Sequence, residues 1–127
     1  MSSKPQVLAC LICDAVHIDP GTGKHTILGV FSNIRARQFP VTHPHMAVFL
    51  MLTDVAVGEH RLRILMGIDP ANAQPLAELK FTSQNAGHRI ELAGGFRNVA
   101  FPEPGNYAIV IELDDEPLLV TNIGVSQ

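Results

Sequence analysis

Two short clusters in the sequence carry residue types that bind metal ions. His43 and His45 are two residues apart, so an extended segment would place both imidazoles on one side. Three carboxylates, the oxygen ligands that calcium prefers, follow one another near the C-terminus: Asp114, Asp115 and Glu116. Neither cluster has further ligands close by in sequence. We therefore interpret the first as a surface loop and the second as a solvated hairpin turn, and we expect no cofactor.

The pair Cys10 and Cys13 has the spacing of zinc ligands and of thioredoxin-like redox pairs. Zinc needs two more ligands, and the redox motif needs a helix that starts after its first cysteine. Neither accompanies this pair. Residues three apart on a strand point to opposite faces, so we predict that these thiols stay apart, free and poorly reactive, and pack as small apolar side chains.

The segment PGTGKHT, residues 20–26, is similar to the end of a nucleotide-binding P-loop. The first glycine of that motif would fall at Ile18 and the hydroxyl for magnesium at His25, so the pattern is not met and a flexible hairpin loop is favoured.

The sequence has no GxSxG or HExxH motif. We expect a non-catalytic binding or assembly module; the alternative is an enzyme or metal-binding protein with a site in the interstrand loops.

The elements that would position these residues are short and rich in Val, Ile, Leu, Phe and Thr, and turn residues separate them. The best helix candidate, residues 70–79, is interrupted by Pro75. The pattern predicts a single all-β domain over residues 1–127, an antiparallel immunoglobulin-like β-sandwich of about seven to nine strands. We expect the first two strands to form a hairpin, and the strands 45–53 and 60–68 to form another. The expected strands are 7–13, 25–31 prolonged through 34–39, 45–53, 60–68, 76–83, 88–92, 96–101, 107–113 and 118–125.

Phe101 to Tyr107 resembles the tyrosine corner of immunoglobulin-like sandwiches, in which a tyrosine near the start of a late strand hydrogen-bonds to the loop before it. A simple core tyrosine would explain the same residue. Together with this corner, three segments resemble a family of small bacterial proteins that has no assigned activity: LICD (11–14), ILGVF (27–31) and Phe39-Pro40. The resemblance implies a sandwich fold and no functional residue.

Composition and charge exclude several classes of function. Of the 127 residues, 46% are hydrophobic and 17% charged, which is enough apolar surface for a folded core. The net charge of −3 gives no basic surface for nucleic acid or an anionic membrane. The apolar run 7–12 is too short for a membrane span and lacks a signal-peptide cleavage site, and free thiols suit a reducing compartment, so we expect a cytoplasmic protein.

The strand that begins at Met46 is apolar on both faces. Met46, Val48, Leu50 and Leu52 share one face, while Ala47, Phe49 and Met51 share the other. Because a strand of a two-sheet sandwich has one inner and one outer face, something must cover the second set. We predict a homo-oligomer in which Ala47, Phe49 and Met51 form the interface, with a further protein partner possible. The alternative is a segment of the same chain, around residues 34–44, that folds over the sheet.

Overall fold

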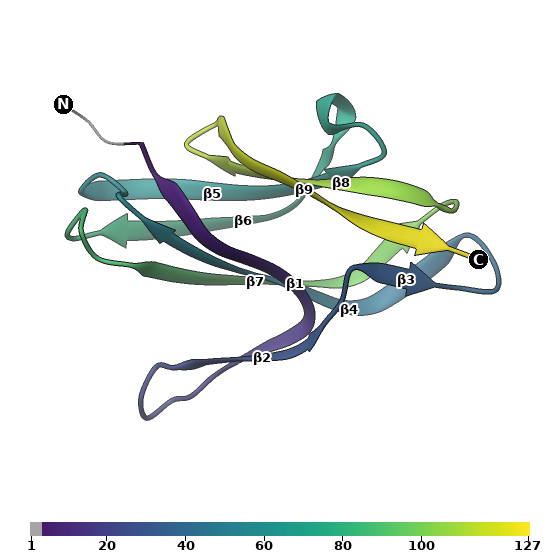
Figure 1. Cartoon of the computed structure of the whole chain (residues 1–127), viewed down its shortest axis with the longest axis horizontal. Helices are drawn as coiled ribbons and strands as arrows, with labels where there is room; N and C mark the ends of the chain where they lie inside the picture. Colours follow the sequence, from purple (N-terminus) through teal and green to yellow (C-terminus); the bar gives the residue numbers. More distant parts are fainter. Residues whose placement is uncertain (1–3) are drawn as a thin grey trace.

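The computed structural model describes residues 4–127, which form nine strands and one short 3-10 helix (Figure 1). The expected strand-rich pattern is confirmed, and most expected strands lie within observed ones. In chain order the elements are β1 (Gln6–Ile18), β2 (His25–Val30), β3 (Asn33–Arg35), β4 (Val41–Thr53), β5 (Gly58–Gly67), η1 (Pro70–Asn72), β6 (Gln74–Ser83), β7 (Ile90–Phe101), β8 (Gly105–Leu113) and β9 (Glu116–Ser126). No helix in this part of the chain is long and apolar enough to cross a membrane.

The strands form two sheets that pack face to face as an immunoglobulin-like β-sandwich. One sheet has the order β2-β1-β4-β7 and the other the order β3-β9-β8-β5-β6. Neighbouring strands are antiparallel except β3 and β9, which are parallel. The fold class predicted from the turn signals is therefore confirmed.

One predicted hairpin is wrong, because β4 and β5 belong to different sheets. The segment between them crosses the edge of the sandwich and inserts Val55, which is fully buried, into the core. Asp54 adopts a positive φ of 59° at this crossing, and its N–H donates to the carbonyl oxygen of Ala86. Burial of Val55 favours the crossing over a tight turn that would keep both strands in one sheet.

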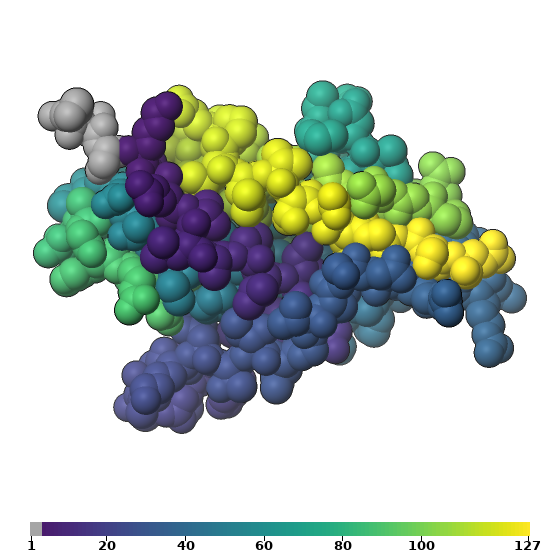
Figure 2. All heavy atoms as spheres, in the orientation of Figure 1, coloured from purple at the N-terminus to yellow at the C-terminus, as the bar shows by residue number. Residues whose placement is uncertain are grey.

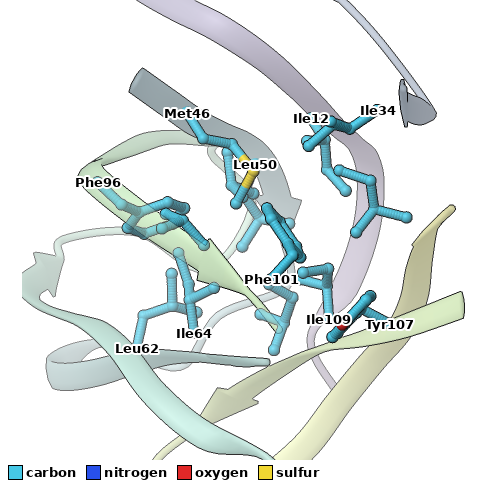
Figure 3. Close-up of a cluster of buried hydrophobic side chains, with 14 of the residues drawn as sticks. Ile12, Ile34, Met46, Leu50, Leu62, Ile64, Phe96, Phe101, Tyr107 and Ile109 are labelled. Carbon is cyan, nitrogen blue, oxygen red and sulfur yellow. The ribbon is translucent and has the colours of Figure 1, made fainter. Parts of the chain in front are cut away.

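The core lies between the two sheets, and strand alternation supplies its side chains. From β4 the residues 46, 48, 50 and 52 point inward, as their alternation predicted, and they meet the inward residues of β5 and β8. Figure 3 shows this cluster, which includes Met46, Leu50, Leu62, Ile64, Phe96, Phe101 and Ile109.

Tyr107 forms the predicted corner at the start of β8. Its hydroxyl donates to the carbonyl oxygen of Glu103 at 2.5 Å and accepts from the Glu103 N–H at 3.3 Å. Its ring is buried and packs edge-on against Phe101, with ring centroids 5.0 Å apart. Both interpretations of Tyr107 are therefore correct: its hydroxyl makes the corner hydrogen bonds, and its ring packs in the core.

The chain departs from a simple sandwich at the middle of β1. Its first half, Gln6 to Cys13, pairs with β4, whereas its second half, Cys13 to Ile18, pairs with β2. Opposite the start of this second half, Gly29 of β2 has φ +67°, and a Cβ there would lie 2.3 Å from a carboxylate oxygen of Asp14. Only glycine fits this position. We call the resulting two-stranded ribbon, residues 14–30, the arm; it lies below the β4–β7 sheet in Figure 1.

Candidate functional site

Two of the three residues predicted to form an interface, Ala47 and Phe49, lie under the arm. Ala47 and Phe49 are each only 5% exposed in the single chain, and Met51 is partly buried. The His25 ring from β2 lies 5.4 Å from the Phe49 ring, centroid to centroid, and its Nδ1 lies 2.9 Å from Oε2 of Glu91 on β7. This face is therefore already covered within the single chain. The covering segment belongs to the same chain, but it is the arm rather than residues 34–44.

The two closely spaced histidines, His43 and His45, have separate surroundings. His43 packs against the Phe31 ring at 5.4 Å, and its Nε2 lies 3.9 Å from Asp14. His45 is exposed and lies directly opposite Arg97 on β7. Among residues 4–127, no group of three or more His, Cys, Asp or Glu side chains is placed to hold a metal ion.

The acidic run at residues 114–116 forms the β8–β9 turn and binds basic groups of β5. Asp114 accepts from the Arg61 N–H at 2.9 Å and lies 2.6 Å from Nδ1 of His60. Asp115 pairs with the guanidinium of Arg61 and lies 3.9 Å from that of Arg63. These contacts connect residues about 54 positions apart in the sequence. They show that Asp114 and Asp115 belong to an ion-pair network that joins the β8–β9 turn to β5.

His60 and Asp114 have the residue types of a catalytic dyad, but both ring nitrogens of His60 face acceptors. Nδ1 faces the Asp114 carboxylate, and Nε2 lies 2.6 Å from the carbonyl oxygen of Ala56. A ring with two acceptors is best satisfied as the doubly protonated imidazolium. The Nε2 that a general base would use is therefore already engaged.

The pKa shifts of this pair follow from the same contacts. Burial alone would lower the pKa of His60, but the bonds to Ala56 and Asp114, together with the Asp114 charge, raise it above 6.5. Burial alone would raise the pKa of Asp114, but the Arg61 N–H, His60 and the nearby positive charges lower it below 3.8. The raised histidine pKa stabilises the fold below pH 6.5, and this contribution is lost as pH rises through the folded value. The lowered aspartate pKa stabilises above pH 3.8, so the pair contributes most between those two values.

The two cysteines lie on opposite sides of the first sheet, as the alternation predicted. Cys10 packs against the core cluster, while Cys13 is fully buried beside Ala47 at the base of the arm. Both are free, and burial raises the pKa of each thiol. A raised pKa disfavours the reactive thiolate, so low reactivity stays the expectation for both.

The surface that sequence reasoning missed is the outside of the arm. Seven large apolar side chains are exposed in the described chain, and three of them lie on this short segment. Leu28 at 50% and Val30 at 59% are on its outer side, while Ile18 at 52% shares the inner side with His25. β2 is also an edge strand, so alternate N–H and C=O groups along it have no partner strand. Figure 2 shows the arm projecting from the two-sheet body. The apolar residues of ILGVF were visible in the sequence, but nothing there distinguished an outer ribbon from a core strand.

A family model described as "Family of unknown function (DUF6941)" matches residues 8–126. The chain belongs to this family. No curated protein matches the sequence of this DUF6941 member. Among solved structures, a β-glucosidase from Listeria innocua in complex with isofagomine is similar, with a TM-score of 0.56 and 12% identity over 76% of this chain and 15% of that chain.

The same β-glucosidase without that ligand gives a TM-score of 0.55 and 10% identity over 98% of this chain and 16% of that chain. The DUF6941 chain thus spans less than a fifth of the enzyme's length, and at this identity the likeness concerns the fold alone. An immunoglobulin-like protein from Pseudomonas aeruginosa has a TM-score of 0.41 and 13% identity, over 98% of each chain.

Proposed function

We propose that this protein is a non-catalytic binding and assembly module that self-associates through the free edge of the arm. The observation that carries the proposal is the composition of β2, HTILGV, compared with the other three sheet edges. β6 carries Pro75 and Lys80, β7 carries Glu91 and Arg97, and β3 is only three residues long. Such features protect edges against pairing with another chain.

β2 lacks this protection. Its one titratable side chain, His25, points to the sheet and pairs with Glu91. A second copy presents the same neutral, apolar edge, so two copies can pair β2 with β2 about a two-fold axis without bringing like charges together. The two four-stranded sheets would then join edge to edge.

The exposed side chains give the strength of this contact. Leu28 and Val30 are about half exposed, and burying the remaining half of each contributes about 1 kcal/mol, or about 4 kcal/mol for both copies. About four new backbone hydrogen bonds add about 4 kcal/mol. The total of about 8 kcal/mol stands against an association cost of about 4 to 15 kcal/mol. At the lowest cost the surplus is about 4 kcal/mol, which corresponds to a dissociation constant of about 1 mM. We therefore propose a weak, reversible dimer that forms near millimolar concentration.

The environment of the chemistry-bearing residues supports the non-catalytic part of the proposal. The one Asp–His pair that resembles a dyad uses Nε2 of His60 to hold Ala56, and the acidic turn is neutralised by arginines.

We place the protein in the cytoplasm because its two cysteines are free and take part in packing.

Sedimentation velocity over about 10 µM to 1 mM tests the proposal. We expect the sedimentation coefficient of the wild type to rise with concentration, and that of Leu28→Lys to stay monomeric, because each lysine would face its own copy. Val120→Lys is the matched control: Val120 is 51% exposed on β9, in the other sheet. A wild type that remains monomeric at about 1 mM, or a control that dissociates as fully as Leu28→Lys, would refute the arm as the contact.

A further inference from the structure

A hollow of about 400 Å³ lies between the arm and the outer face of β4 and β7. Val16 and Ile18 of the arm form its wall, and its floor consists of small residues: Ala47, Ala93 and Gly95. A Cβ added at Gly95 would meet no atom within 4 Å, so the space above the floor is open. Glycine inside a strand often marks a place where a ligand approaches the backbone closely.

The rim of this hollow carries two side chains that can donate hydrogen bonds to an anion. His45 on β4 and Arg97 on β7 are directly opposed in the strand register, and both line the hollow. Directly opposed residues have Cβ atoms about 5 Å apart, so one small group bound above them can reach both side chains. None of the ion pairs formed within residues 4–127 includes either side chain. Both side chains can therefore donate hydrogen bonds to one anion from outside.

The remaining charged group at the rim limits which anion fits. Asp14 lines the same hollow, and it lies 3.9 Å from Nε2 of His43. A doubly charged phosphate would meet this carboxylate, whereas a single negative charge would be repelled less. The planar guanidinium of Arg97 matches a carboxylate through two parallel hydrogen bonds. Charge and shape together favour a monocarboxylate.

We propose that the hollow binds a small aliphatic monocarboxylate. Its head group binds Arg97 and His45, and its alkyl chain lies on Ala47 and Gly95 against the apolar wall of the arm. The site uses the inner side of the arm, whereas self-association uses the free edge of β2. The two proposals therefore stand or fall separately.

Titration with octanoate, followed by calorimetry and by amide chemical shifts, tests the site in the full-length protein. We expect saturable binding to one site, with shifts concentrated in residues 14–18, 45–47 and 93–97. 1-Octanol supplies the same alkyl chain without the charge, and we expect it to bind at least tenfold more weakly.

Two variants and one control separate the contributions of charge and space. Arg97→Gln should weaken octanoate binding at least tenfold, and Gly95→Val should abolish it by filling the floor without a clash. Arg89→Gln, which removes an exposed arginine just before β7, should bind as the wild type does. The proposal is overturned if octanoate shows no saturation by about 1 mM, if 1-octanol binds equally well, or if Arg97→Gln and Arg89→Gln behave alike. Binding that weakens as protein concentration rises would show that a second copy covers the hollow, and would also overturn it.

Discussion

Replacement of Phe49 by alanine tests whether the arm closes over the sheet in solution. Phe49 is 5% exposed and lies on the outer face of β4, between Leu11 and Ala93 in the register and under the ring of His25. Truncating a buried phenylalanine costs about 3 to 5 kcal/mol. Because this ring packs under a two-stranded ribbon rather than between the two sheets, we expect the lower end, about 3 kcal/mol.

Urea unfolding measures this loss directly. With a denaturant slope of about 1.5 kcal/mol per molar, a loss of about 3 kcal/mol moves the unfolding midpoint down by about 2 M. Leu28→Ala is the matched control within the arm, because this side chain is half exposed and points away from Phe49. We expect it to cost under about 1 kcal/mol.

Cys13 provides a second, independent readout of arm closure. Its side chain is fully buried at the base of the arm, and its Sγ lies 3.6 Å from the Ala47 carbonyl oxygen. In a Cys10→Ser background only this thiol can react, and we expect Phe49→Ala to raise its labelling rate at least tenfold. If Phe49→Ala costs less than about 1 kcal/mol and leaves the labelling rate unchanged, Phe49 does not support the arm and the packing argument is refuted.

Three further changes test the other features of the fold. Tyr107→Phe keeps the buried ring but removes the corner hydrogen bonds, so we expect a loss of about 1 kcal/mol in urea unfolding; an unchanged midpoint would mean that the hydroxyl adds nothing. Gly29→Ala places a Cβ against Asp14 at a positive φ, so we expect a loss of at least about 1 kcal/mol; the double variant with Asp14→Gly should recover the part due to the clash. His60→Gln should cost more at pH 5.5 than at pH 8.5, by about 0.5 to 1 kcal/mol, because the wild type loses its imidazolium contact with Asp114 as pH rises. An equal cost at both pH values would contradict the assigned protonation.

The sequence predicted the strands well because turn chemistry is local. The run Asp19 to Gly23 ends one strand through contacts within itself: Asp19 accepts from the N–H and the hydroxyl of Thr22, and the Gly23 N–H donates to the Asp19 carbonyl oxygen. The corner at Tyr107 likewise depends on residues four apart. Such signals can be read without knowledge of the rest of the chain.

Pairing between strands was harder to predict because it depends on distant residues. The segment 54–57 has the composition of a hairpin turn, yet the burial of Val55 in the core sends the chain to the second sheet. The partners of the acidic turn, His60 and Arg61, lie 54 and 53 positions away from Asp114, respectively. Their contacts follow from the register of β5 and β8, which the sequence pattern does not specify.

The two-sided apolar character of β4 correctly indicated a covered outer face, and the arm shows how one chain can cover it. Val16, His25 and Ile27, all partly buried, supply the inner side of the ribbon over Phe49. A two-stranded ribbon is too thin to have a core of its own, so its outer side must either be polar or meet another surface. Here that side presents Leu28 and Val30, both exposed, on an edge strand that lacks charge protection. Because the arm covers the outer face of β4, the exposed apolar surface of this region lies on the arm instead. We therefore propose self-association at the free edge of β2 and not at the sheet face where the sequence pattern had predicted it.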